Sequence, residues 1–331
     1  MGKYAAAESL YTRAREIQKK LLGEHHPSYV NSSGNLAIFY EQTGQYEKAE
    51  PLFILQGELE LQNLKNTFTI LSEKEKGDYL ATKLSVVETN NSFLFNYGKA
   101  APSICRKNFD LQLALKSLSL TDTRNMMEAV NNSPDTALKR IFNEWKQSKS
   151  LLAKQYSLPV NKRITNLKAE ETQAEKREKE LVRKSSEFRN QQNAIRISMA
   201  DVQRNLRPGE AAIEFVRFRL FNKKWTDSII YAAYLVKQND STPRFIPLCE
   251  EKQLGKYFSA AGGASNITSI YRSDPLDEKD KPSISGDSLY TLVWKPLQPY
   301  LIGIKKIDYS PAGLLYKIAF HALPTGDSSL L

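Results

Sequence analysis

A chain of 331 residues with 41% hydrophobic and 25% charged residues has the composition of a globular protein with two sizeable cores. No stretch approaches the roughly 20 apolar residues that span a bilayer, and the N-terminus lacks the apolar centre of a secretory signal. The net charge of +10 comes from Lys and Arg interleaved with Asp and Glu. We expect a cytoplasmic protein without a membrane partner, with nucleic-acid binding as a weak alternative.

Six residues near the N-terminus recur 42 positions later, which indicates a helical repeat. The recurring residues are Gly2, Tyr4, Ala7, Glu8, Leu10 and Tyr11, which return as Gly44, Tyr46, Ala49, Glu50, Leu52 and Phe53. Small residues such as Ala37 and Ala49 let two helices approach closely, and Gly44 permits the turn between them. Leu36, Tyr40 and Phe53 are expected to fill the space between the helices.

These spacings resemble a tetratricopeptide repeat of the longer variant found in kinesin light chains. Gln56 departs from the pattern, because the family usually has a small residue there. Residues 22–27 are expected to form the linker between repeats, ending at Pro27. The resemblance implies a surface that binds a protein or peptide partner. The first copy lacks its opening helix, so we expect a natural protein that extends upstream.

The next hundred residues are expected to be helical, with breaks at Ser72, at 119–123 and at 133–135. Ser72 followed by Glu75 is the signature of a capping box. Residues 135–156 carry an apolar stripe of five residues at helical spacing, namely Leu138, Ile141, Phe142, Trp145 and Leu152. The helical region is therefore predicted to continue well beyond the repeats.

Between residues 160 and 202, apolar residues return every seven positions. They are Val160, Leu167, Ala174, Leu181, Phe188, Ile195 and Val202. The partner positions include Glu171 and Glu178, which disfavours a free-standing coiled coil. The pattern predicts one long helix of about 30 residues that braces two domains, with the charged run 168–189 as a solvated face.

The pattern changes to short β-type segments after Leu206-Arg207-Pro208-Gly209. We expect strands at 211–218, 228–237 and 244–248, with 222–227 connecting the first two. Helices are predicted at 250–258 and 288–301, the second kinked or ended by Pro296. A last strand pair is expected at 305–309 and 314–319, and surface loops at 262–263 and 274–286.

The later part of the chain resembles the caspase-like CHAT domains that follow tetratricopeptide repeats. The resemblance runs from about residue 30 to the C-terminus and is carried by Leu71–Glu75, Leu115–Leu120, Asp201–Gln203, Leu206–Phe215, Trp294–Leu297 and Tyr309–Leu315. It implies a cysteine endopeptidase with a His and Cys dyad. Both family motifs follow the hairpin at Ser310–Gly313, and the chain stops soon after it, so we expect a fragment without the dyad.

No catalytic, cofactor-binding or metal-binding residue can be assigned. Cys105 and Cys249 are expected to be small buried thiols, and His321 a partly buried structural histidine. His25 and His26 have no third ligand nearby in sequence, which favours a linker over a metal site.

The predicted fold class is therefore α plus α/β. Tetratricopeptide repeats occupy residues 1–60, a helical connector 61–158, a long charged helix 159–200 and the first part of a caspase-like domain 201–331. The first functional hypothesis is the inactive front section of a repeat-containing peptidase. The second is a non-catalytic protein-interaction scaffold.

Overall fold

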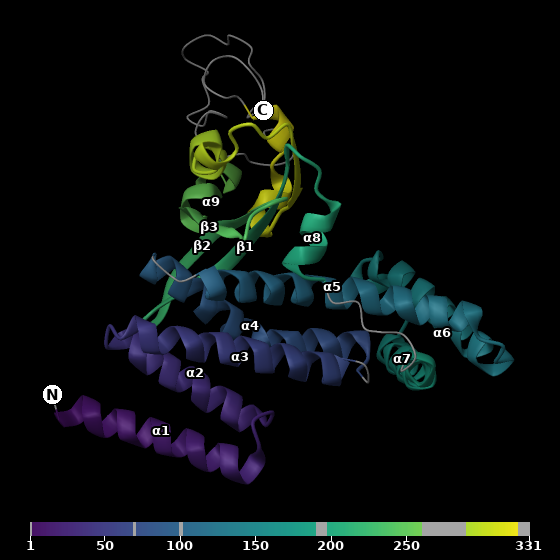
Figure 1. Ribbon diagram of the computed structural model, residues 1–331. Helices are drawn as coiled ribbons and strands as arrows, with labels where there is room; N and C mark the ends of the chain where they lie inside the picture. Colours follow the sequence, from purple (N-terminus) through teal and green to yellow (C-terminus); the bar gives the residue numbers. More distant parts are fainter. Residues whose placement is uncertain (1, 69–70, 99–101, 190–196, 260–288, 324–331) are drawn as a thin grey trace.

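The computed structural model describes residues 2–68, 71–98, 102–189, 197–259 and 289–323. In Figure 1 the helices stack in layers, from α1 (Gly2–Leu22) and α2 (Pro27–Gln42) through α3 (Tyr46–Phe68) to α4 (Glu73–Tyr97) and α5 (Pro102–Asn132). A four-stranded sheet stands on α4 and α5. No helix in the described part of the chain is long and apolar enough to cross a membrane.

The first three helices have the predicted helix-turn-helix arrangement. Gly44 adopts a φ of 74° in the turn between α2 and α3, a conformation that glycine accepts without strain. The imidazole Nδ1 of His26 accepts a hydrogen bond from the Ser28 backbone N–H at 3.2 Å, and Pro27 occupies the first turn of α2. The 25–27 linker is thus a helix cap, in agreement with the linker prediction.

Helices α4 and α5 follow with one confirmed and one wrong boundary. The capping box at Ser72 is present, since the Ser72 Oγ accepts from the Glu75 N–H and the Glu75 carboxylate accepts from the Ser72 N–H. The predicted break at 119–123 is wrong, because α5 continues through it to Asn132. Ser and Thr favour caps and turns but are also found inside helices, as they are here in α5.

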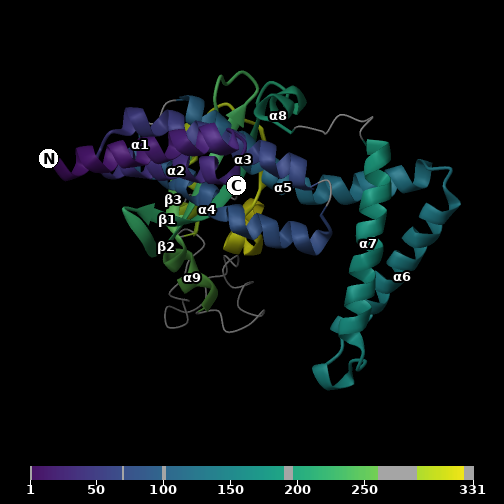
Figure 2. The same cartoon turned by 90° about the horizontal axis from the view of Figure 1, so that it is seen from below.

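The helix predicted at 135–156 is confirmed, and the long helix predicted at 159–200 is shorter than expected and packs against it as a helical hairpin. Helix α6 (Thr136–Tyr156) turns back through a 3₁₀ turn at Val160–Lys162 into α7 (Leu167–Arg189), and the pair projects from the body as an arm (Figure 2). A separate helix, α8 (Met199–Asn205), starts at the extended residue Ser198. The prediction of a single helix over 160–202 is therefore wrong. The side chain of Phe188 and the whole of Ile195 lie outside the described structure.

The α6–α7 contact also corrects the prediction of a fully solvated charged face. Glu178 is buried, and its carboxylate accepts a hydrogen bond from the Trp145 indole N–H at 3.2 Å. Lys149 lies 3.3 Å from the same carboxylate. A buried carboxylate needs such partners, so the hairpin holds a specific register in addition to its apolar stripe.

The sheet has the strand order β3-β2-β1-β4. Its strands are β1 (Glu210–Asn222), β2 (Lys224–Lys237), β3 (Arg244–Glu250) and β4 (Lys306–Ser310). The first three pair antiparallel, and β4 pairs parallel with β1. Strands β1 and β2 are longer than predicted, because the turn between them is tight at Lys223, whose φ is 58°.

Side chains alternate across the sheet and build two cores. Val216 and Phe218 of β1 pack with Phe93 and Phe109 of the helices. Phe215, from the opposite face of β1, packs in a second core with residues that come after β3 in sequence. These residues belong to α9 (Glu251–Ser259), to a π-helical turn at Tyr290–Trp294 and to 3₁₀ turns at Gln298–Tyr300, Gly313–Lys317 and Phe320–Ala322.

Several C-terminal predictions need correction. Helix 250–258 is confirmed as α9, and strand 305–309 as β4. The expected strand at 314–319 is wrong, since 3₁₀ turns occupy that segment. The helix expected at 288–301 is reduced to the π-turn and a 3₁₀ turn on either side of Pro296, which ends the helix because it lacks an N–H. The loops expected at 262–263 and 274–286 lie outside the described residues.

Helix α4 covers the edge of β1 that β4 leaves free. Strand β4 pairs with β1 only as far as Glu214. Beyond that point, Glu88, Ser92 and Asn96 lie on one face of α4 at spacings of four residues. The Arg219 N–H donates to Glu88 at 3.0 Å, the Phe221 N–H to the Ser92 Oγ at 2.9 Å, and the Asn96 amide donates to the Phe221 carbonyl at 2.9 Å. Side chains of a helix thus satisfy the strand edge in place of a neighbouring strand.

The Ser92→Ala variant is expected to lower the free energy of unfolding by about 1–2 kcal/mol, because the buried Phe221 N–H loses its acceptor. Ser85→Ala changes an exposed serine of the same helix, so it is the matched control for the gain in helix propensity. Urea unfolding of the two variants measures the difference. Equal stabilities would show that the bond to β1 contributes nothing.

Candidate protein-interaction site

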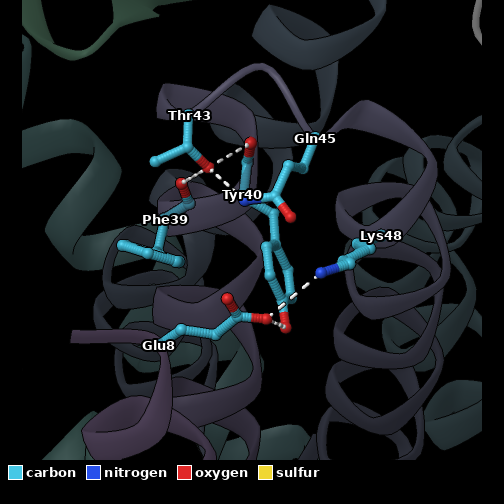
Figure 3. A network of polar contacts seen from close by, with 6 residues as sticks. All are labelled: Glu8, Phe39, Tyr40, Thr43, Gln45 and Lys48. Atoms are coloured by element: carbon cyan, nitrogen blue, oxygen red, sulfur yellow. Dashed lines mark hydrogen bonds and ion pairs between the residues drawn. The ribbon is translucent and has the colours of Figure 1, made fainter. Parts of the chain in front are cut away.

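Helix α1 is fixed on α2 and α3 by a polar network around Glu8 (Figure 3). The Glu8 Oε1 accepts hydrogen bonds from the Tyr40 hydroxyl at 2.8 Å and from the Lys48 Nζ at 3.2 Å. Lys48 also lies over the Tyr40 ring at 5.0 Å from its centroid. The Tyr40 hydroxyl, and after it Lys48, lowers the pKa of Glu8, so the carboxylate stays charged at neutral pH.

A second set of contacts lies further along α1. The Arg15 Nε donates to the Ser33 Oγ at 2.9 Å, and its terminal nitrogen donates to the Tyr29 hydroxyl at 2.7 Å. Tyr29 and Ser33 are both buried on α2. Together with Glu8, Arg15 sets the angle and register of α1 across α2 at two points about two helical turns apart.

The repeated residues make corresponding contacts in the second copy. Tyr11 of α1 contacts Phe39 of α2, and its counterpart Phe53 of α3 contacts Phe93 of α4 at 4.9 Å between ring centroids. Glu50, the counterpart of Glu8, accepts a hydrogen bond from the Ser103 hydroxyl at 3.0 Å. The pattern that relates α1 to α2 therefore continues from α3 into the helices of the connector.

The departure at Gln56 has a structural explanation in Gly34. A Cβ at Gly34 would lie 2.6 Å from the Gln56 Cδ and 2.7 Å from its Oε1, and closer still to its Nε2. Gly34 of α2 therefore makes room for the large residue of α3. The sequence signal was present, since a glycine inside a helix stands opposite the residue that departs from the family pattern.

The outer side of α1 exposes an apolar stripe. Leu10, Ile17 and Leu21 have exposed fractions of 68%, 47% and 74%. Their spacing of seven and then four residues places them on one helix face. Helix α1 is the outermost helix of the stack (Figure 1). Its stripe of three large exposed aliphatic side chains is suited to contact with another polypeptide.

Helix α2, which packs on α1, exposes a narrow polar strip. Asn31 and Asn35 are exposed and one turn apart, whereas most of α2 is buried. A side-chain amide offers donors and an acceptor, which match the N–H and C=O groups of an extended chain. We call Leu10, Ile17, Leu21, Asn31 and Asn35 the α1–α2 surface.

The C-terminal end of α2 connects this surface to the sheet. The Gln42 amide donates to the Lys223 carbonyl at the β1–β2 turn, at 2.9 Å. The Asn96 amide of α4 donates to the Glu41 Oε1 at 3.2 Å, and the other Glu41 oxygen is buried without a partner in the described structure. Burial raises the pKa of Glu41 to about 7, and the bond from Asn96 offsets only part of this.

The two cysteines have structural roles, as the sequence predicted. Cys105 and Cys249 are buried, and burial raises the pKa of each thiol to about 12, so neither is a ready nucleophile. The Cys105 thiol donates to the Pro243 carbonyl at 3.0 Å. His321 is exposed in a 3₁₀ turn, which corrects the expectation that it is partly buried. Among the described residues no hydrogen bond joins its side chain to either cysteine.

Within the described part of the chain, no group of three His, Cys, Asp or Glu side chains could hold a metal ion. His25 and His26 belong to the helix linker, as the cap on α2 shows. Glu8, Arg15 and Glu41 are the polar residues that position this region, and sequence patterns missed their roles because each acts on a partner far away in the chain.

Comparison with known protein families matches residues 1–53 to the tetratricopeptide repeat. This match covers α1, α2 and the first turns of α3, the elements that form the α1–α2 surface. No curated protein and no solved structure matches the chain. The N-terminal part is thus a tetratricopeptide-type helical unit, a kind of unit that suggests protein interaction.

Proposed function

We propose that the chain is a protein-interaction protein whose α1–α2 surface binds a polypeptide partner. The observation that carries the proposal is the tetratricopeptide match over two packed helices, of which α1 exposes an apolar stripe and α2 a strip of side-chain amides. An extended or helical partner segment would place apolar side chains on Leu10 and Ile17 and its backbone against Asn31 and Asn35.

The α/β part carries the second half of the proposal. We propose that residues 201–331 are the first part of a caspase-like domain of the CHAT type, following a helical connector at 61–158 and the charged helix segment 159–200. A mixed sheet with helical elements on both faces and a parallel β1–β4 pair supports this assignment. The buried thiols support the expectation that this chain has no peptidase activity.

The alternative is a non-catalytic scaffold. Its support is that Cys105 and Cys249 both serve in the cores and that no nucleophile is paired with His321 among the described residues. In this alternative the α/β part holds the connector helices in place. Partner binding by the repeat unit is common to both hypotheses.

Capture of a partner from the source cells tests the binding proposal. Two double variants change the surface, Leu10→Asp/Ile17→Asp and Asn31→Ala/Asn35→Ala. Each should capture at least tenfold less of the partner protein than the wild type does. Leu84→Asp changes an equally exposed leucine of α4 outside the surface and should retain it. Retention of the same protein by both surface variants would contradict the proposal.

The fate of the captured partner separates the two alternatives. Cleavage of that partner by the full-length gene product, abolished by iodoacetamide, would favour the peptidase. An intact partner under the same conditions would favour the scaffold. The present chain is expected to leave the partner intact in either case.

A further inference from the structure

A half-open cavity of about 590 Å³ lies where the helices meet the connection between β2 and β3. Its walls come from the end of α4, the first turn of α5, residues 237–245 and the 3₁₀ turn at Tyr300. The cavity is remote in sequence from the α1–α2 surface. Its volume falls within the roughly 300–1,000 Å³ of small-molecule sites.

Two cations line this cavity. The Arg244 guanidinium lies over the Tyr300 ring, with the Cζ 4.6 Å from the ring centroid. Stacking fixes the plane of the guanidinium and leaves the N–H groups on its rim available for a planar anion. Lys237 supplies the second positive charge. Among the described residues no carboxylate forms an ion pair with either side chain.

The one acidic side chain of the lining is turned to the loop itself. The Asp240 carboxylate accepts a hydrogen bond from the Lys237 backbone N–H at 2.9 Å. The Gln203 amide of α8 donates to the carbonyls of Lys237, Gln238 and Asp240, at 3.1, 3.1 and 2.7 Å. This connection is thus held in one conformation, so its cations are placed before any ligand arrives.

The remaining walls are mixed, with hydroxyl groups from Ser241 and Thr242 beside apolar residues. Phe95, Phe245, Pro247 and Pro299 lie among the lining residues and offer contact for a ring or a short hydrocarbon body. Cys105 also lines the cavity, but its thiol donates to the Pro243 carbonyl. Burial keeps this thiol protonated, so the cavity is suited to binding and not to thiol chemistry.

We propose that this cavity binds a small organic anion, a carboxylate or a phosphate monoester that carries an apolar body. Arg244 grips the anionic oxygens in a bidentate manner, Lys237 adds charge, and the aromatic and proline side chains cover the body. The shared chemistry is a planar or tetrahedral group of anionic oxygens.

Titration calorimetry of the full chain with four probes tests this proposal. Benzoate and phenyl phosphate combine an anion with a ring, inorganic phosphate has the anion alone, and benzyl alcohol has the ring alone. At least one of the first two should bind tenfold or more tightly than both of the last two. The tighter of benzoate and phenyl phosphate identifies the anionic group.

Variants locate the binding. Arg244→Gln should weaken the better probe at least tenfold, Arg244→Lys should give an intermediate loss, and Lys237→Gln should weaken it several-fold. Lys139→Gln, an exposed lysine on the distant α6, is the matched control and should leave binding unchanged. Unchanged thermal melting shows that each variant is folded. Absence of binding by all probes, equal binding of benzyl alcohol, or full binding by Arg244→Gln would overturn the proposal.

Discussion

The Glu41→Gln variant is expected to be more stable than the wild type at pH 8 by about 2–3 kcal/mol, and equally stable near pH 4.5. Glu41 is buried with one unpartnered oxygen, and its pKa is raised to about 7 from the 4.5 of an exposed glutamate. Each pKa unit corresponds to about 1.4 kcal/mol. The neutral amide avoids the cost of burying a charge but can leave one donor unpaired, which reduces the gain.

The sign of this effect follows from proton linkage. Because the folded state holds the proton more tightly than the unfolded state, the stabilisation is fully present below about pH 4.5 and is lost as the pH rises through about 7. Two effects shift the pKa of Glu41, namely burial and the hydrogen bond from Asn96. Neither involves a nearby charge that could offset the cost of burying the carboxylate. Urea unfolding of wild type and variant between pH 4.5 and 8 measures the difference.

A matched control is Glu47→Gln, which changes an exposed glutamate of α3 and should alter stability by less than about 0.5 kcal/mol at every pH. A constant difference between wild type and Glu41→Gln across this range would show that Glu41 is not a buried, titrating group. The stability change reports on the junction of α2, α4 and the β1–β2 hairpin, since Glu41 lies there.

Gly313→Ala is expected to destabilise the fold by about 3 kcal/mol or more. Gly313 has a φ of 53°, which costs an alanine about 1 kcal/mol. Its new Cβ would also lie 2.6 Å from the Arg217 Cδ and closer still to the Tyr231 hydroxyl. That hydroxyl accepts from the Leu314 N–H at 2.9 Å and donates to the Glu251 carboxylate at 2.8 Å, so it cannot move freely.

Gly303→Ala separates the two contributions. Gly303 has a φ of 79° but no atom within 4 Å of an added Cβ, so this variant should lose only the backbone part. In a Tyr231→Phe background, Gly313→Ala should cost less than in the wild type, because the hydroxyl is gone. Thermal unfolding of the wild type, Gly313→Ala, Tyr231→Phe and the double variant gives the coupling energy between the two positions. Equal losses for Gly303→Ala and Gly313→Ala would show that the close contacts are relieved without cost.

Local signals predicted much of the fold. The β-branched and aromatic runs located β1, β2 and β3, and Ser72 with Glu75 located the start of α4. The segment after Gly313 was misassigned, because its apolar residues pack as a 3₁₀ turn and no strand of the described sheet pairs with it. The seven-residue period at 160–202 is compatible with one helix, yet a 3₁₀ turn at Val160–Lys162 precedes α7, and α8 begins separately after Ser198.

The candidate site was predictable in kind but not in detail. The 42-residue echo indicated the repeat and its helices, and the match over residues 1–53 agrees with it. Glu88, Ser92 and Asn96 form a polar stripe on α4 that amphipathic patterns assign to solvent, yet they bond to β1. Glu41 carries no local signal, because its burial arises from elements far apart in the chain.

Amide hydrogen exchange of the captured complex tests the central claim that the α1–α2 surface receives the partner. Binding should slow exchange in residues 4–42 and leave the α6–α7 arm unchanged, and the Leu10→Asp/Ile17→Asp variant should show no slowing. Slowed exchange confined to the arm or to the sheet, with residues 4–42 unchanged, would contradict the assignment of the repeat helices as the binding site.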